Sequence, residues 1–218
     1  MNEMEIKDAS MIRYENVTKI IKGQCVVDHV NITVPRGRVT GFQGVNGSGK
    51  TMLMRLACGL IHPTEGKVYI DGKELGREIQ FPPSVGILIE GPSFLGNYSA
   101  FDNLKLLAEL TGIVDDATIK EAIARVGLDP ENKKKYRKFS LGMKQRLGIA
   151  NAIMEKSDLL ILDEPTNALD SEGVEILKRI VREEKERGAT ILISCHDASI
   201  LQELSDLIYH LESGKVIG

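Results

Sequence analysis

A glycine-rich segment in the first quarter of the chain most restricts what this sequence can fold into. Residues 44–51, GVNGSGKT, fit the pattern Gly-x-x-x-x-Gly-Lys-Thr. Glycines at Gly44, Gly47 and Gly49 allow a loop whose backbone N–H groups turn inward around a polyphosphate. In such a loop Lys50 is expected to reach the β- and γ-phosphates, and Thr51 is expected to ligate Mg²⁺. The residues expected to contact a nucleotide in this segment are Gly44, Asn46, Gly47, Ser48, Gly49, Lys50, Thr51 and Met52.

The sequence on either side of the loop supports this interpretation. An apolar run at 39–43 precedes it and predicts a buried strand. The stretch MLMRLACGL follows it and predicts a helix that ends at Gly59. A strand, a loop and a helix in this order aim a helix N-terminus at an anion.

Composition excludes several classes of protein. The 218 residues are 42% hydrophobic and 27% charged, which predicts a globular chain with one sizeable core. A net charge of −3 argues against a dedicated nucleic-acid binder, since such domains are usually basic. Cys25, Cys58 and Cys195 lie in apolar surroundings without paired-ligand spacing, so we expect buried, reduced thiols in a cytosolic protein and no metal site built on sulfur.

Neither a targeting signal nor a membrane span is expected. The first ten residues, MNEMEIKDAS, have no basic flank and no apolar centre, so they do not resemble a signal peptide. The longest apolar runs fall far short of the roughly 18 residues that a spanning helix requires. A role at a membrane would therefore need another chain to cross it.

Short apolar runs alternate with helical patterns, which predicts an α/β fold. The predicted strands cover residues 31–34, 39–43, 67–70, 85–89, 159–162, 189–194 and 207–211. Several are continuously apolar, as buried parallel strands tend to be. Between the fourth and fifth of these runs, helices are predicted at 102–111 and 116–126, with Leu104, Leu107 and Ala108 on one face of the first and Gly127 as a stop after the second. A largely helical insert thus interrupts an α/β core, and a hairpin is predicted around Ser213 and Gly214.

Two carboxylates follow the apolar run LLIL at 159–162. Asp163 and Glu164 lie at the carboxyl end of this predicted strand, where open α/β sheets place their ligands. Adjacent residues of a strand point to opposite faces, so the two side chains can take different roles. Asp163 is expected to hold Mg²⁺, and Glu164 is expected to polarise the water that attacks the γ-phosphate.

A second helix start is predicted at Ser140 in FSLGMKQRLGIANAIM. Serine is a good N-cap, and Met143, Leu147 and Ala150 follow at helical spacing. A second phosphate site within one subunit would be redundant, so this helix end is expected to meet a nucleotide held by another copy. The nearby basic run KKKYRK at 133–138 reads either as a solvated loop face or as an electropositive rim near a phosphate or lipid surface.

Taken together, these segments resemble the nucleotide-binding subunit of ATP-binding cassette (ABC) transporters over essentially the whole chain. Residues 44–51 look like Walker A, FSLGM at 139–143 the family signature, LLILDE at 159–164 Walker B, and NALD at 167–170 the D-loop, with His196 as the switch histidine. The resemblance implies a P-loop NTPase of RecA-like core with an antiparallel β lobe, at 1–89 and 158–218, and a helical subdomain at about 90–157, within one domain spanning 1–218.

The same resemblance implies partners and cofactors. Two copies, identical or related, would close head to tail over two ATP molecules with Mg²⁺, each Walker A facing Ser140 and Gly142 of the other copy. Glu164, His196 and Lys50 would act at the γ-phosphate, and Asp170 would communicate across the dimer. A separate membrane permease would dock near residues 90–101 and hold the subunit at the inner face of the membrane.

Two positions depart from the family pattern. Ile21, beside Ile20, stands where an aromatic usually stacks on adenine, so we expect a weaker grip on the base; Tyr14 would take this place if the register differs. Glu90 stands where most members have a glutamine, and its carboxylate either contacts Mg²⁺ or stays outside the site. A glutamate there, followed by Pro92 and Phe94, then by Asn103 and Leu104 and by SLGMKQRLGIA at 140–150, is similar to the bacitracin-resistance and lantibiotic-immunity exporters.

The sequence thus favours an ATP hydrolase that energises a permease, with a peptide antibiotic as the expected cargo. A non-transport ATPase of the same fold is less favoured, because the chain has one cassette and no heptad run. A regulatory module that binds nucleotide without hydrolysis is less favoured because Glu164 and His196 are present. A GTPase lacks support because no Asn-Lys-x-Asp segment occurs.

Overall fold

The computed structural model describes residues 10–217. The predicted domain limits at 1 and 218 lie outside this range, as does nearly all of the N-terminal segment that lacks a signal-peptide pattern. Among the described residues, no helix is long and apolar enough to cross a membrane.

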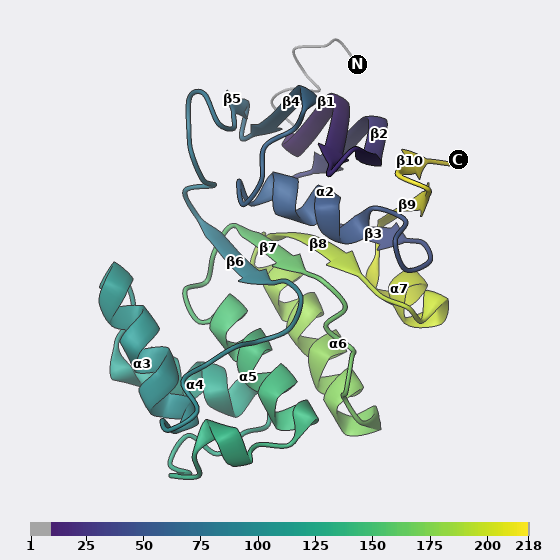
Figure 1. Cartoon of the computed structure of the whole chain (residues 1–218). Coiled ribbons are helices and arrows are strands. Elements are labelled where there is room, and N and C mark those ends of the chain that lie inside the picture. The colour runs from purple at the N-terminus through teal and green to yellow at the C-terminus, as the bar shows by residue number, and fades with distance from the viewer. Residues whose placement is uncertain (1–9, 218) are drawn as a thin grey trace.

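A six-stranded sheet forms the centre of the molecule, in the order β10-β9-β3-β8-β7-β6 (Figure 1). Its strands are β3 (Val39–Gln43), β6 (Val85–Leu88), β7 (Leu159–Leu162), β8 (Thr190–Ser194), β9 (Leu207–Glu212) and β10 (Lys215–Val216). All pairs are parallel except β9 with β10, which form the predicted hairpin through Ser213 and Gly214. Every residue of β7 and β8 is buried, which explains why these strands are continuously apolar rather than alternating.

A four-stranded antiparallel sheet, in the order β2-β1-β4-β5, packs above it. Its strands are β1 (Ser10–Ile21), β2 (Gln24–Pro35), β4 (Glu65–Ile70) and β5 (Lys73–Glu74). The sequence patterns predicted only 31–34 of the long β1–β2 hairpin. They missed the rest because several register shifts interrupt the pairing, so buried residues do not alternate regularly along β1.

Helix α2 (Lys50–Ala57) lies between the two sheets (Figure 1). Alternate residues of the central strands separate two cores, as the strand period of two requires. Leu159 and Ile161 pack toward α2 and the four-stranded sheet, whereas Leu160 and Leu162 pack toward the helices on the other face. Helix α6 (Ser171–Glu186) covers that second face, and α7 (Ala198–Leu204) packs against β3 and α6.

The predicted helical insert is present as α3 (Ala100–Thr111), α4 (Asp116–Arg125), a short 3-10 turn (Tyr136–Lys138) and α5 (Leu141–Ile153). Helix α3 begins two residues earlier than predicted, because Ser99 caps it and Asp102 completes a capping box. Leu104 and Ala108 are buried as expected, but Leu107 is 36% exposed. The three residues share one face of α3, as their spacing of three and four requires, but Leu107 is not fully covered there. In the basic run, the lysines are exposed and only Tyr136 is buried.

The three cysteines occupy different environments. Cys58 and Cys195 are buried as expected, and burial raises the pKa of the Cys58 thiol to about 12. Cys25 is exposed near the turn between β1 and β2, so the prediction of burial was wrong at this position. The reason is the unrecognised hairpin, whose tip projects away from the core. All three thiols are free.

Candidate functional site

The glycine-rich loop joins β3 to α2 and leaves the start of that helix open. Gly49 occupies the N-cap position with φ 107°, and no side chain caps the helix. A Cβ atom at Gly49 would lie 2.9 Å from the carbonyl oxygen of Val26, so only glycine fits this conformation and this close approach. The first N–H groups of a helix have no intrahelical partner and carry partial positive charge. The loop is therefore built to receive an anion.

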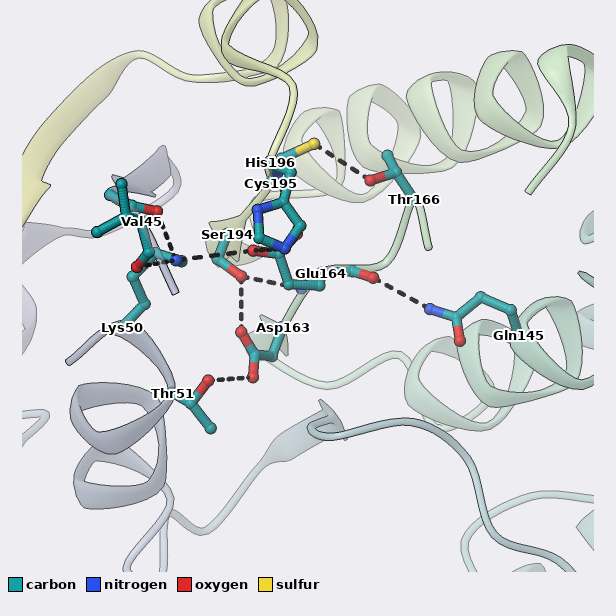
Figure 2. A network of polar contacts seen from close by, with 11 residues as sticks. Val45, Lys50, Thr51, Gln145, Asp163, Glu164, Thr166, Ser194, Cys195 and His196 are labelled. Carbon is teal, nitrogen blue, oxygen red and sulfur yellow. Dashed lines mark hydrogen bonds and ion pairs between the residues drawn. The ribbon is translucent and has the colours of Figure 1, made fainter. Parts of the chain in front are cut away.

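Lys50 reaches back across this loop and is 5% exposed. Its Nζ donates hydrogen bonds to the carbonyl oxygens of Gly44 at 2.7 Å and Val45 at 3.2 Å (Figure 2). It also lies 3.8 Å from Oε1 of Glu164. The ammonium group is thus held at the loop by carbonyl groups and a carboxylate, with its charge directed toward the same space as the helix N-terminus.

Asp163 joins three elements through a chain of short hydrogen bonds. Thr51 Oγ1 donates to Asp163 Oδ2 at 2.7 Å, and Ser194 Oγ donates to Asp163 Oδ1 at 2.6 Å (Figure 2). A hydroxyl and a carboxylate beside a phosphate loop are the hard oxygen ligands that Mg²⁺ prefers, and Mg²⁺ sites commonly use only one or two carboxylates together with substrate phosphates. In the described range, no cluster of three or more His, Cys, Asp or Glu side chains could hold a metal. Thr51 and Asp163 are a set of oxygen donors of the size that Mg²⁺ takes from a protein when substrate phosphates complete its shell.

Glu164 points away from Asp163, as expected for neighbours at a strand end. Its backbone has φ 49°, its N–H donates to Ser194 Oγ at 2.9 Å, and its Oε2 accepts the backbone N–H of His196 at 2.9 Å. Its Oε1 is buried, lies 3.6 Å from Nε2 of His196 and has no hydrogen-bond partner within residues 10–217. Burial raises the pKa of the Glu164 carboxyl, and the nearby charges of His196 and Lys50 only partly oppose this effect.

The phosphate loop, Lys50, Thr51 and Glu164 line one cavity of about 470 Å³, whereas Asp163 and His196 are not among its lining residues. It is lined by Ile21, Lys22, Gln24, Val26, Asn46, Gly47, Ser48, Gly49, Lys50, Thr51, Met52, Glu90 and Glu164. The structure therefore brings most of the predicted nucleotide-contacting residues together. Tyr14 is 1% exposed, and its hydroxyl donates to the Leu53 carbonyl at 2.8 Å, so the alternative placement of Tyr14 against the base is wrong.

Glu90 lines the cavity but is directed to a partner that sequence reasoning missed. Its carboxylate forms an ion pair with Arg55 of α2, and its side chain is 54% exposed. Arg55 follows Thr51 by one helical turn, so this pair connects the end of β6 to the helix of the phosphate loop. The spacing of four residues between Thr51 and Arg55 is visible in the sequence. The ion pair between Arg55 and Glu90, however, depends on the order of the strands in the sheet.

A second group of predicted residues lies elsewhere. Ser140, Gly142 and Asp170 line a different cavity, apart from the phosphate loop. Ser140 Oγ accepts the backbone N–H of Met143 at 3.2 Å, which confirms the predicted N-cap. Arg146, which sequence reasoning did not single out, binds Asp170 Oδ1 at 2.8 Å. The two cavities have no lining residue in common.

Gln145 was also missed, although it lies within the quoted FSLGMKQR segment. It is 7% exposed, and its Nε2 donates to the backbone carbonyls of Glu164 at 3.3 Å and Pro165 at 3.1 Å. Helix α5 is thereby tied to the backbone that presents Glu164 (Figure 2).

Comparison with known proteins agrees with this geometry. The model of the family described as "ABC transporter" matches residues 27–167. An uncharacterised ABC transporter ATP-binding protein of Bacillus subtilis, YybJ, is 48% identical over 94% of each chain. The bacitracin transport ATP-binding protein BcrA of Bacillus licheniformis is 41% identical over 96% of this chain and 69% of its own length. The lantibiotic transport ATP-binding protein SrtF of Streptococcus pyogenes is 38% identical over 95% of this chain and 89% of its own.

Solved structures support the same assignment. The dimeric bacterial ABC transporter cassette MJ0796 superimposes with a TM-score of 0.87 at 26% identity, over 95% of this chain and 97% of that one. The ATP-binding subunit of another ABC transporter gives a TM-score of 0.86 at 26% identity, over 96% and 89% of the two chains. The predicted fold class and the predicted similarity to bacitracin and lantibiotic transport proteins are both confirmed. The chain belongs to the ABC transporter family, as an ATP-binding subunit with the nucleotide-binding fold of that family.

Proposed function

We propose that this subunit hydrolyses ATP with Mg²⁺ and that hydrolysis drives a separate membrane permease. One observation carries the proposal: the two carboxylates after β7 diverge to different partners. Asp163 Oδ2 accepts a hydrogen bond from Thr51 Oγ1 at 2.7 Å. Oε1 of Glu164 instead lies 3.8 Å from Lys50 Nζ and 3.6 Å from His196 Nε2. A metal-binding role and a water-polarising role can therefore be carried out side by side.

In this proposal the free N–H groups of the loop and Lys50 bind the β- and γ-phosphates. Thr51 and Asp163 would hold Mg²⁺, which when bound would neutralise phosphate charge. Glu164 accepts a hydrogen bond from the attacking water, and the raised pKa of its carboxyl makes its carboxylate a stronger base than that of an ordinary glutamate. His196 borders the same space from the end of β8 and contributes a side chain beside the γ-phosphate.

We further propose that two copies, or this copy and a related cassette, close head to tail around the nucleotides. Ser140, Gly142 and Asp170 line a different cavity from that of the phosphate loop, which supports this arrangement, because contact of these residues with the nucleotide would then come from a second copy. The similarity to a cassette described as dimeric also supports it. Asp170 would then transmit contacts across the interface, with Arg146 holding its carboxylate.

The proposed cargo is a peptide antibiotic of the bacitracin or lantibiotic type, exported or removed from the membrane. Support comes from the two transport proteins named above, at 41% and 38% identity. The permease is proposed to dock on residues 90–101, where Leu95 and Tyr98 are 55% and 42% exposed and the backbone is largely irregular. Such docking would place the subunit at the inner face of the membrane.

The deciding experiment compares Mg²⁺-dependent ATP hydrolysis of the wild type with that of Glu164→Gln and follows oligomeric state by light scattering with and without ATP. We expect Glu164→Gln to lose turnover and to accumulate as an ATP-dependent dimer, since Asp163 and Lys50 remain in place. Glu186→Gln, at the exposed end of α6, serves as a matched control and should behave as the wild type. Unchanged turnover would assign the base elsewhere, and a monomer at saturating ATP would contradict the closed dimer.

A further inference from the structure

A group of positive charges lies in the connection between α4 and α5 (Figure 1). All of its side chains are exposed, and none forms an ion pair with any other residue that the structure describes. Two carboxylates, Asp102 and Glu131, lie within electrostatic reach. Glu131 is already paired with Lys120 at 2.6 Å, so of these two only Asp102 offsets part of the charge. We call this group the basic surface, and it consists of Lys133, Lys134, Lys135, Arg137 and Lys138.

Tyr136 lies within this run, is buried, and holds the backbone of the basic surface in place. Its hydroxyl donates to the Pro92 carbonyl at 2.8 Å, and its backbone N–H donates to the Tyr98 carbonyl at 2.9 Å. Its ring packs against Phe94 and Phe139, with ring centroids 5.4 and 5.7 Å apart. The charged side chains therefore extend from an anchored backbone, so a partner does not have to order the loop before it binds.

The basic surface adjoins the segment on which the permease is proposed to dock. The backbone N–H of Arg137 donates to the carbonyl of Gly96 at 3.0 Å, beside the contact between Tyr136 and Tyr98. A permease crosses the bilayer, so a surface next to its docking segment would be turned toward the membrane around it. This placement rests on the proposed function, whereas the exposure and charge of the five side chains do not.

The residue types favour a lipid surface over a protein partner. Four of the five cations are lysines. Lysine is depleted at protein–protein interfaces, where arginine is enriched. A lysine ammonium is a point charge on a flexible stem and needs no fixed geometry, which suits the mobile phosphates of a fluid bilayer. Clusters of about four to eight cations bind anionic lipids, each cation adding about fivefold in affinity. We infer that the basic surface binds the anionic phospholipid headgroups of the membrane beside the permease.

The first test is sedimentation of the purified full chain with phospholipid vesicles, without nucleotide or permease. Vesicles made of equal parts phosphatidylglycerol and phosphatidylcholine should bind the protein, and vesicles of phosphatidylcholine alone should not. Raising the salt concentration from about 0.1 M to about 1 M should release the protein, because the screening length shortens from about 10 Å to about 3 Å. Equal binding to both kinds of vesicle would overturn the inference. Absence of binding to the anionic vesicles would also overturn it, in favour of solvent or an acidic protein segment facing the lysines.

The second test locates the binding surface. The triple variant Lys133→Gln, Lys134→Gln, Lys135→Gln should lose about 10²-fold in affinity for the anionic vesicles, at about fivefold per charge. The same positions changed to arginine keep their charge and should keep the wild-type affinity within about threefold. The matched control removes three exposed lysines elsewhere and should lose less than about fivefold, since it lowers only the net charge. Equal losses in the two glutamine triples would overturn the inference. The control changes are Lys67→Gln, Lys73→Gln and Lys156→Gln.

ATP hydrolysis distinguishes this inference from the proposed function. Lys133, Lys134 and Lys135 are exposed and lie outside the residues assigned to the nucleotide, so their glutamine triple should hydrolyse ATP and unfold thermally as the wild type does. Vesicle binding by a wild-type protein that hydrolyses no ATP would contradict the proposed function alone. Intact hydrolysis without binding to anionic vesicles would overturn the lipid surface alone.

Discussion

The pH dependence of turnover gives a sharp test of the role assigned to Glu164. Its Oε1 lies 3.8 Å from the Lys50 ammonium, a distance at which two charges attract by about 4 kcal/mol at an effective dielectric of 20. Even so, the pKa of the carboxyl is raised, because burial outweighs the charges of His196 and Lys50. A base must be ionised, so kcat/KM should fall about tenfold per pH unit on the acid side of this raised pKa.

The contribution of Glu164 to the free energy of unfolding should fall as pH rises, whereas the rate of ATP hydrolysis should increase. Between the ordinary pKa of a glutamate and the raised pKa of Glu164, the folded carboxyl holds a proton that the unfolded one has lost. The native state then binds more protons, so this group's contribution to the free energy of unfolding is greatest at low pH and is lost as pH rises through the folded pKa. Carboxyls with lowered pKa have the opposite effect at lower pH; an example is Asp170, which accepts the backbone N–H of Gly173 and a hydrogen bond from Arg146. The contribution must therefore be measured as the difference between the wild type and Glu164→Gln.

The assay is initial-rate ATP hydrolysis from about pH 5 to pH 9, with kcat/KM reporting the free enzyme. Urea unfolding of both proteins is measured over the same range. At pH 8, Glu164→Gln should turn over about 10²- to 10⁴-fold more slowly than the wild type, and its residual rate should lack the acid limb. A flat wild-type profile, or an equally steep acid limb in Glu164→Gln, would refute the assignment of Glu164 as the base.

Three further substitutions test the structure around the site. Tyr14→Phe should lower the free energy of unfolding in urea by about 1–2 kcal/mol, because the Leu53 carbonyl loses its buried donor, with nucleotide affinity unchanged; a weaker affinity would place Tyr14 in the site after all. Glu90→Gln should keep substantial hydrolysis in the isolated subunit, since exposed ion pairs such as Glu90–Arg55 contribute about 0–1 kcal/mol; complete loss of Mg²⁺-dependent ATP binding would instead place Glu90 at the metal. Gly86→Ala should reduce stability by about 1–3 kcal/mol or more in thermal unfolding, because the added methyl group would overlap the Ala152 carbonyl oxygen of α5; an unchanged melting temperature would contradict this packing of β6.

Much of the central sheet was predictable because strands that are buried on both faces appear in the sequence as continuous apolar runs. The runs at 39–43 and 159–162 match β3 and β7 residue for residue. Most of the hairpin β1–β2 shows no such pattern, because register shifts interrupt the alternation of apolar and polar residues that marks a half-buried strand. The missed hairpin also caused the error at Cys25, because exposure at a turn cannot be inferred until the turn itself is recognised.

Side-chain partnerships between distant segments were the least predictable part of the site. Arg55 and Glu90 are 35 positions apart in the sequence, and Arg146 and Asp170 are 24 positions apart. From the sequence, each of these four residues has the pattern of an ordinary surface charge, because the neighbouring residues do not indicate which distant side chain will pair with it. Only the order of strands and the packing of α5 bring these groups together.

Strand order brings together three segments that were assigned to one site from the sequence, with His196 assigned through the family resemblance. The phosphate loop follows β3, Asp163 follows β7, and His196 follows β8, and these strands are neighbours in the order β3-β8-β7. Parallel neighbours end at the same edge of a sheet, so side chains that follow them converge. Ser140 begins a helix that packs against the face of this sheet, and Asp170 caps another; neither follows a strand directly. Convergence of strand ends at one edge therefore does not account for these two residues, which agrees with the proposal that a second copy would bring them to a phosphate.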